Sequence, residues 1–472
     1  MTTHAQPSVA GVTGSLNVNP MFARAGEARS VPRHQIPDVP MDPTTAYQIV
    51  HDHLMLDGNA RLNLATFVTT WMEPQADQLM AECLDKNMID KDEYPQTAEL
   101  ETRCVNMLAG LWHAPDPAQA LGCSTIGSSE AAMFAGLALK RRWQQRRRSA
   151  GKDAARPNLV MGINVQVCWD KFCNYFEVEP RFAPMAGERF HLDAEQAIRL
   201  CDENTIGVVA ILGSTFDGSY EPVREIAAAL DDLQARTGLD VPLHVDGASG
   251  GMVAPFIDPD LVWDFRVPRV ASINTSGHKY GLVYPGVGWV LWRDADALPD
   301  ELIFRVNYLG GEMATLALNF SRPGGQVVAQ YYTFLRLGRE GFRQVQQECR
   351  DVALYTSAQV AEMGPFRLLT RGDELPVFAF TMADDVTNFN VFDVSAGLRE
   401  RGWQVPAYTF PADRQDLAAL RVVVRNGTGR EIADLLLDDL NHLLPRLTRQ
   451  TSPARGVEAA SFDHASGHRR KS

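Results

Sequence analysis

The 472-residue sequence lacks most features of secreted, membrane-spanning and metal-binding proteins. Its seven cysteines are scattered without the paired spacing of a metal site, and an odd number makes a poor disulfide framework. No long apolar run occurs, and the N-terminal segment has no basic stretch followed by an apolar one. We therefore expect a cytoplasmic protein without a standard secretion signal, integral membrane association or metal.

The sequence also has fewer basic than acidic residues. Lys and Arg number 45 against 58 Asp and Glu, which gives a net charge of -13. A protein that neutralises phosphate backbones needs the opposite balance, so nucleic acid and anionic membranes are disfavoured as partners. The hydrophobic share of 45% is ordinary for a globular protein and is sufficient for a sizeable core.

The two ends of the chain differ from its middle. Residues 1 to about 41 and the segment from about Arg449 onward lack sustained periodicity and predict a flexible arm and a flexible tail. Between them, apolar β-branched runs alternate with helical stretches, which indicates an α/β domain whose largely parallel sheet is buried on both faces. The predicted strands are 159–165, 207–214, 242–249, 269–276 and 287–292, and the helices include 130–148 and 221–238.

A second, smaller domain is predicted near the C-terminus. The helical pattern over 326–363 is longer than an ordinary globular helix and predicts a bridge between two domains. Shorter strands at 375–382 and 420–425, with helices at 390–402 and 431–444, then indicate a small α+β domain. The predicted division is an N-terminal arm and segment at 1–65, a large domain at 66–345, a small domain at 346–448 and a tail at 449–472.

Lysine is scarce, with seven residues against 38 arginines. Lys279 differs from the others because it follows an apolar strand in a small-residue turn, SINTSGHKYG, that can aim an amine into a cleft. Asp246 ends another apolar strand 33 residues earlier, about one crossover unit away. A buried carboxylate there needs a cationic partner, such as a protonated pyridine nitrogen. An amine able to form a Schiff base near such an acid is the minimum site for pyridoxal phosphate.

A phosphate cradle is predicted at Gly127-Ser128-Ser129, directly before the helix at 130–148. Hydroxyls and free N–H groups at a helix N-terminus bind phosphate by hydrogen bonds and by the helix dipole. Taken alone, this motif is commonly a plain serine N-cap, and His278-Lys279 alone is commonly an exposed turn. Together with Asp246, the motifs predict pyridoxal 5'-phosphate as cofactor.

Longer strings resemble the glutamate decarboxylase family, a group of pyridoxal-phosphate-dependent enzymes, in its bacterial type. The resemblance runs from about Ala46 to about Leu444. It implies the aspartate aminotransferase fold type I, with a large mostly parallel-sheet domain and a small C-terminal α+β domain. The strings are NLATF (63–67), DKNMIDKDEYPQ (85–96), RCVNMLAGLWHAP (103–115), TIGSSEA (125–131), VQVCWDKF (165–172), HVDGASGG (244–251), WDFRVPRVASINTSGHKYG (263–281) and NFSRPGGQVVAQYY (319–332).

The resemblance implies the roles of individual cofactor residues. Lys279 and Asp246 are the implied catalytic residues, with Lys279 holding the cofactor and Asp246 on its ring nitrogen. Ala248 and Gln166 are implied to lie beneath and above the ring, and Thr215 beside it. The implied phosphate contacts are His278, Ser128, Ser129 and Ser276. The role of Asp170, four positions after Gln166, stays open.

The resemblance also implies the substrate contacts. Thr66, Phe67 through its backbone N–H, Asn87 and Asp90 are implied to hold the distal carboxylate, partly from a partner subunit of a homodimer or of a hexamer built as a trimer of dimers. Arg425 is implied to lie near the α-carboxylate. Because two carboxylates in contact must share a proton, Asp90 suits acid conditions. The implied reaction converts L-glutamate to 4-aminobutanoate and CO2 and consumes a proton, with a possible role in acid resistance.

Two other interpretations remain open. One is a decarboxylase of the same fold that acts on aromatic amino acids, cysteine sulfinate or aspartate. The other is a binding protein that kept the fold without the cofactor, although the presence of both Lys279 and Asp246 disfavours it. The tail string AASFDHASGHRRKS resembles the C-terminus of acid-resistance members of the family. The resemblance implies that His464 closes the active site near neutral pH, and the alternative is a tail without regulatory function.

Overall fold

The computed structural model describes residues 33–307 and 313–455. The chain divides into two compact units, residues 1–59 and residues 60–472. The described part of the first unit contains one helix, α1 (Pro43–Leu54). Asp42 caps it by accepting a hydrogen bond from the Thr45 N–H at 3.0 Å, and Pro43 stands in its first turn, where a missing N–H costs nothing.

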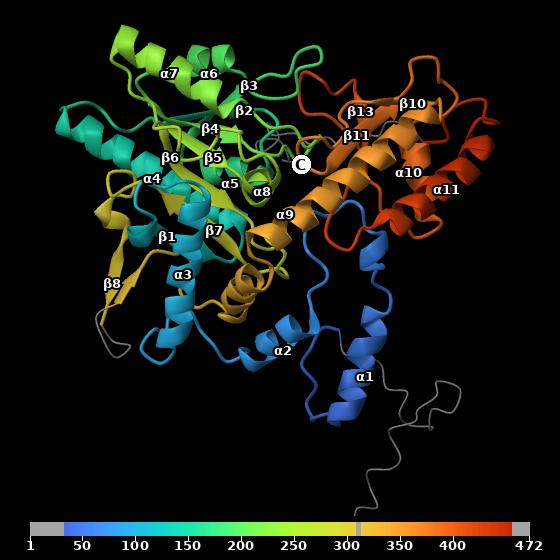
Figure 1. Ribbon diagram of the computed structural model, residues 1–472, viewed down its shortest axis with the longest axis horizontal. Helices are drawn as coiled ribbons and strands as arrows, with labels where there is room; N and C mark the ends of the chain where they lie inside the picture. Colours follow the sequence, from blue (N-terminus) through green and yellow to red (C-terminus); the bar gives the residue numbers. More distant parts are fainter. Residues whose placement is uncertain (1–32, 308–312, 456–472) are drawn as a thin grey trace, which may run out of the picture. The chain divides into compact units, whose positions relative to one another are not determined.

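The second unit is built around a seven-stranded sheet in the order β1-β7-β6-β5-β4-β2-β3 (Figure 1). Only β7 runs antiparallel to its neighbours, and all the other adjacent pairs are parallel. This confirms the predicted large, mostly parallel sheet. The strands are β1 (Leu121–Thr125), β2 (Asn158–Gly162), β3 (Glu179–Ala183), β4 (Thr205–Ile211), β5 (Leu243–Asp246), β6 (Val270–Thr275) and β7 (Gly288–Trp292).

Amphipathic helices connect and cover these strands. In α7 the buried residues Val223, Ile226, Ala227 and Leu230 recur at helical spacing, and the helix ends at Gly238, whose φ of 75° favours glycine. The helices of this part are α2 (Pro74–Glu82), α3 (Pro95–Leu111), α4 (Ser128–Ser149), α5 (Val167–Tyr175), α6 (Ala194–Leu200), α7 (Val223–Thr237) and α8 (Ala254–Ile257).

A long helix, α9 (Gly325–Glu362), links the large sheet region to the C-terminal region, as its pattern predicted (Figure 1). It packs against α2, α3 and α8 on one side and against β10, β11 and α11 on the other. Its backbone departs from helical geometry at Gly338, where φ is 57°. The helix is therefore kinked at a residue that tolerates positive φ.

The C-terminal region contains a four-stranded antiparallel sheet in the order β10-β11-β13-β12. This confirms the predicted small α+β part of the fold. Its elements are β10 (Phe366–Leu368), β11 (Val377–Met382), α10 (Val391–Arg399), β12 (Ala407–Thr409), β13 (Ala418–Val423) and α11 (Arg430–Leu447). A separate hairpin consists of β8 (Phe304–Val306) and β9 (Met313–Thr315).

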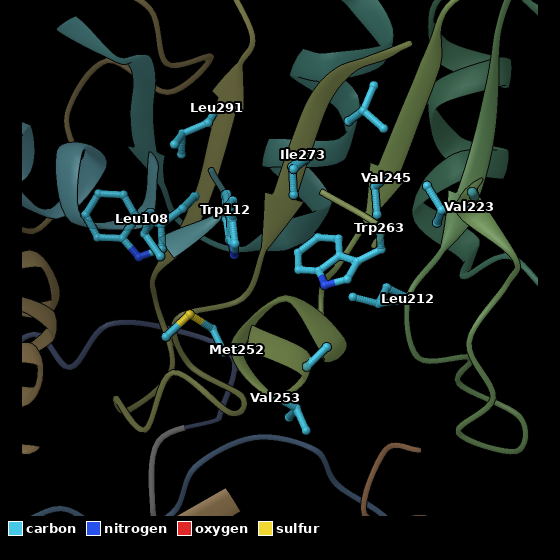
Figure 2. Packing of buried hydrophobic residues seen from close by; sticks show 14 of the residues in the cluster. Leu108, Trp112, Leu212, Val223, Val245, Met252, Val253, Trp263, Ile273 and Leu291 are labelled. Carbon is cyan, nitrogen blue, oxygen red and sulfur yellow. The ribbon is translucent and has the colours of Figure 1, made fainter. Parts of the chain in front are cut away.

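The largest hydrophobic cluster lies on one face of the seven-stranded sheet. Figure 2 shows Val245, Ile273 and Leu291, on three neighbouring strands, in the same cluster as Trp112 and Trp263. The two indole rings meet edge to face with centroids 6.3 Å apart. This packing fixes the strands whose carboxyl ends carry the candidate site. Within the described residues, no helix is long and apolar enough to cross a membrane.

Candidate active site

A polar cavity of about 150 Å³ lies at the carboxyl ends of β4, β5 and β6 and at the start of α4. In a parallel sheet this edge is the usual place for a ligand site. The cavity is lined by Ser128, Ser129, Asn164, Gln166, Cys168, Ile211, Gly213, Thr215, Asp246, Ala248, Ser249, His278 and Lys279. Eight of the nine cofactor residues predicted from the sequence are in this set, and only Ser276 lies outside it.

Asp246 ends β5 and is 5% exposed. Its Oδ1 accepts hydrogen bonds from the Ala248 N–H and the Asn274 amide, both at 3.1 Å, and its Oδ2 accepts one from the Trp169 indole at 2.8 Å. All three partners are donors, so both oxygens act as acceptors. The carboxylate is thus available to a cationic ring nitrogen in the cavity.

Lys279 lies in the turn after β6, with its Nζ 3.5 Å from the Ser249 hydroxyl and 5.3 Å from the centre of the Phe67 ring. Burial lowers the pKa of Lys279, and the charge of Asp246 opposes this effect. A lowered pKa favours the neutral amine, which is the nucleophilic form. The geometry therefore suits a lysine that reacts with a carbonyl carbon.

The start of α4 has the features of a phosphate cradle. Gly127 precedes the helix and provides no side-chain cap, so the first N–H groups are left for another acceptor. Two buried polar atoms nearby, the Ser276 hydroxyl and Nδ1 of His278, have no hydrogen-bond partner among the described residues. Burial, with the charge of Lys279, lowers the pKa of His278 to about 4. A phosphate group would satisfy these donors, so the residues fit pyridoxal phosphate.

The segment that carries Thr66 and Phe67 is fastened to the lysine turn. The Thr69 N–H donates to the carbonyl of His278 at 2.8 Å, and the Thr69 hydroxyl donates to the carbonyl of Lys279 at 2.7 Å. The Phe67 ring consequently lies beside the Lys279 amine. The structure thus places Phe67 beside Lys279, and the substrate contacts of Thr66 and Phe67 stay a prediction.

Arg425 is occupied by the protein itself. Its three guanidinium nitrogens donate to the Thr70 hydroxyl and to main-chain carbonyls, including those of Ala60, Asn63 and Thr66. Each of the three nitrogens therefore has an acceptor among the described residues. Through these bonds the side chain anchors residues 60–70 to the C-terminal region. The predicted contact of Arg425 with the substrate therefore stays a prediction that the geometry does not favour.

Arg421 on β13 was not singled out from the sequence, although it lies nearer the site. Its guanidinium donates to the carbonyls of Thr215 and Ala65, and it lies 4.8 Å from the centre of the Phe67 ring. Its Nε is buried and has no partner among the described residues. Its charge is close enough to contribute to the lowered pKa of Lys279. The sequence feature that could have revealed Arg421 is its place inside the apolar run LRVVVR, because a buried arginine there requires buried acceptors.

Asn87 and Asp90 do not line the cavity within this chain. The Asn87 amide donates to the Ser321 hydroxyl at 3.3 Å and accepts from the Arg322 N–H at 3.1 Å. The Asp90 N–H donates to the carbonyl of Asn87 at 3.1 Å. Of the predicted distal-carboxylate residues, only Phe67 has a contact with a cofactor residue within the described part of the chain, through its ring beside the Lys279 amine.

Trp169 and Asn274, which donate to Asp246, were also missed. Each left a signal: Trp169 lies in VQVCWDKF three positions after Gln166, and Ser272 and Asn274 alternate with apolar residues in a predicted strand. A polar pair at period two inside a buried strand points to a shared hydrogen-bonded neighbour. His464, predicted to close the site, lies outside the described residues.

The sequence matches the family described as Pyridoxal-dependent decarboxylase conserved domain over residues 32–383. The chain belongs to the pyridoxal-dependent decarboxylase family. This confirms the resemblance found in the sequence and the cofactor, pyridoxal 5'-phosphate. The protein is a pyridoxal-phosphate-dependent carboxy-lyase.

Relatives extend the match over nearly the whole chain. A glutamate decarboxylase of Aliivibrio fischeri is 53% identical over 448 residues, which cover 94% of this chain and 96% of the relative. Glutamate decarboxylase 5 of Arabidopsis thaliana is 49% identical over 93% of this chain and 88% of its own length. The solved glutamate decarboxylase of Lactobacillus brevis has a TM-score of 0.88 and 44% identity, covering 91% of this chain and 98% of that one.

A more distant structure shows the fold alone. The sphingosine-1-phosphate lyase of Burkholderia pseudomallei has a TM-score of 0.74 at 24% identity, over 88% of this chain and 93% of that chain. The fold of this chain is therefore also found in a protein that is not named a glutamate decarboxylase.

Proposed function

We propose that this decarboxylase acts on L-glutamate, releasing CO2 from the α-carbon and forming 4-aminobutanoate with consumption of one proton. The observation that carries the proposal is the attachment of the Thr66–Thr69 segment to the turn of His278 and Lys279, two residues that line a cavity fitting the cofactor. Support comes from relatives named glutamate decarboxylase that match 94% and 93% of this chain.

Bound pyridoxal phosphate supplies the chemistry that accepts the electron pair left when the carboxylate departs. Lys279 holds the cofactor and returns to it after each turnover, and its lowered pKa favours the neutral amine this requires. Asp246 supplies a negative charge to the protonated ring nitrogen. The N–H groups at the start of α4 hold the phosphate.

Arg421 is the proposed partner of the substrate α-carboxylate. Its buried Nε has no acceptor in the part of the chain that the structure describes, whereas every guanidinium nitrogen of Arg425 has one. An unsatisfied donor of a buried cation is costly, and a carboxylate oxygen removes that cost. The proposed contact is thus Arg421 on β13, four residues before Arg425, and the contact of Arg425 stays a prediction from the resemblance.

Substrate orientation decides which bond breaks, because the bond to be cleaved must stand perpendicular to the cofactor ring. Thr66 and the Phe67 N–H are the proposed anchors of the distal carboxylate within one chain. Asn87 and Asp90 are proposed to complete this anchor from a second copy, as the family resemblance implies, because the Asn87 amide is bonded to Ser321 and Arg322 within its own chain. The proposed assembly is accordingly a homodimer, alone or as part of a hexamer.

A substrate panel with CO2 detection tests the proposal. We expect strong preference for glutamate over glutamine, which lacks the charge, and over aspartate, which is one methylene shorter. Comparable kcat/KM values for glutamate and glutamine would contradict the distal carboxylate site. Preference for an aromatic amino acid would instead support a decarboxylase of the same fold with another substrate.

The physiological setting and the tail remain proposals that follow from this reaction. Consumption of a proton in each turnover raises the surrounding pH, which supports a role in acid resistance. An imidazole must be neutral to act as a nucleophile, so closure by His464 is expected only near or above its ordinary pKa of about 6.5. The cytoplasmic location also stays a prediction.

A further inference from the structure

A patch of polar side chains surrounds Asp246 inside the large sheet. The register of β5 and β6 pairs His244 with Ser272 and Asp246 with Asn274. Because residues two apart on a strand share a face, these four side chains form one cluster. The Trp169 ring of α5 packs against it, with its centroid 5.3 Å from that of His244. All five side chains are buried, although charged and polar groups seldom enter such a core without a partner.

With the His244 ring neutral, as its lowered pKa indicates, the hydrogen bonds of the cluster run in one direction. The Asn274 amide nitrogen must face the Asp246 carboxylate, to which it donates at 3.1 Å. The Asn274 oxygen therefore faces Nε2 of His244 at 2.7 Å, and this nitrogen must carry a hydrogen. Nδ1 of His244 is then an acceptor for the Ser272 hydroxyl at 2.8 Å. The result is a neutral imidazole that fixes the orientation of Asn274.

The burial of His244 preserves these hydrogen bonds down to a pH of about 4. Burial lowers the pKa of His244 to about 4, so the ring is neutral above that pH. The other oxygen of Asp246 is held by the Trp169 indole at 2.8 Å. Each contact is a donor to the carboxylate, and together the contacts limit its rotation.

We propose that Asn274, oriented by His244, and Trp169 are positioning residues that hold the Asp246 carboxylate in the orientation that the cofactor ring nitrogen requires. None of the three lines the cavity, so they act through Asp246. The inference rests on the proposed contact between Asp246 and the ring nitrogen. The proposal gives a function to His244 on β5, Asn274 on β6 and Trp169 on α5, whose burial substrate binding does not explain.

The test uses purified holoenzyme of Asn274→Leu, His244→Leu and Trp169→Phe. Two readouts are measured: the rate at which cofactor is lost during dialysis, and the pH midpoint of the absorbance of the bound cofactor. We expect roughly tenfold or faster cofactor loss, the size of one lost hydrogen bond to a charged group. The pH midpoint is expected to move by about one unit. His244→Gln, which can keep a donor near Asn274, should stay close to the wild type.

Matched controls separate this role from general destabilisation. Asn158→Leu removes a buried amide that donates to Asp202 at 2.8 Å, and Trp143→Phe removes an indole N–H bonded to the Glu203 carbonyl at 3.0 Å. Neither residue lines the cavity. Both controls are expected to lower the melting temperature while leaving cofactor loss and the pH midpoint unchanged.

Asp246→Asn distinguishes the two ways in which the inference can fail. If Asp246→Asn leaves both readouts unchanged, the ring nitrogen contact itself is wrong. If it changes them while Asn274→Leu, His244→Leu and Trp169→Phe behave like the controls, the positioning role alone is overturned. Trp169→Phe keeps most of the ring volume and should fold even where a leucine variant does not.

Discussion

Lys279 is chemically distinct because of where the chain places it. Removal of its ammonium group from water lowers its pKa, and the nearby Asp246 charge only partly restores it. Arg421 adds a second positive charge that also favours the neutral amine. The burial of Lys279, the negative charge of Asp246 and the positive charge of Arg421 thus act together on the protonation of the reactive nitrogen.

Replacing this amine should abolish the reaction. We expect Lys279→Ala to lose the absorbance band that borohydride reduction removes from the wild type, together with nearly all CO2 release. The measurement is a spectrum and a CO2 assay of the same preparation, with Lys152→Ala as a control at an exposed lysine. Wild-type turnover in Lys279→Ala would show that the wrong lysine was assigned.

Arg421 and Arg425 can be separated by kinetics and stability. Arg421→Lys keeps the charge but loses the planar fork, so we expect kcat/KM for glutamate to fall by about ten- to hundredfold. Arg425→Lys should mainly lower the melting temperature, because its contacts are the main-chain carbonyls of residues 60–66. The reverse pattern would return the α-carboxylate contact to Arg425.

At the scale of elements, the pairing of β5 with β6 creates both the site and a cost at low pH. The pairing brings His244, Ser272 and Asn274 around Asp246. The folded protein binds no proton at His244 until the pH approaches about 4, whereas an unfolded histidine is protonated below about 6.5. Between these values the unfolded state binds more protons, so stability falls as the pH falls.

This linkage predicts a measurable slope. From pH 6.5 to pH 4 the free energy of unfolding should decrease by up to about 3 kcal/mol on account of His244. Denaturant titrations of the wild type and of His244→Gln across this range check it. The substitution should flatten the slope, and equal slopes in the two proteins would exclude His244 as its source.

At the scale of the whole molecule, one chain does not contain a complete set of predicted substrate contacts. Thr66 and Phe67 lie on a segment fastened to the Lys279 turn, while Asn87 is held by Ser321 and Arg322. A second copy can supply the missing group. Apolar side chains such as Ile126 and Leu318, which are 46% and 45% exposed, are available for such an interface.

Mixing two inactive variants tests this sharing. A dimer of one Lys279→Ala chain and one Asn87→Ala chain would contain one site with both wild-type residues. We therefore expect activity to reappear when the two are refolded together, at about half the wild-type value per mixed dimer if the sites act independently. Failure to regain activity, with mixed dimers shown by mass, would place Asn87 in its own chain's site.

Tail closure is tested by truncation after Arg455, which keeps the hydrogen bonds of Arg455 with Asn390 and Asp393. If His464 closes the site, the truncated enzyme should remain active at pH values where the full chain loses activity. Activity and cofactor absorbance are followed together from acid to neutral pH. An unchanged midpoint would exclude the tail as the cause of inactivation.

The sequence by itself determined the class of fold and the centre of the site. Apolar strands alternating with helices specified the parallel sheet, because local periodicity follows directly from burial. Motifs at strand ends, Lys279, Asp246 and Gly127-Ser128-Ser129, could be combined because parallel strands place their carboxyl ends on one edge. The substrate came from resemblance, since no local pattern specifies a ligand.

The tertiary structure decided which charged groups are already satisfied. Arg421 lies on β13 and Arg425 two residues beyond its end, and the sequence could not show that the carbonyls of residues 60–66 occupy Arg425. In the same way, only the register of β5 against β6 joins His244 and Asn274 to Asp246. Hydrogen-bond partners distant in sequence depend on register and packing, and these are fixed by the whole fold rather than by local spacing.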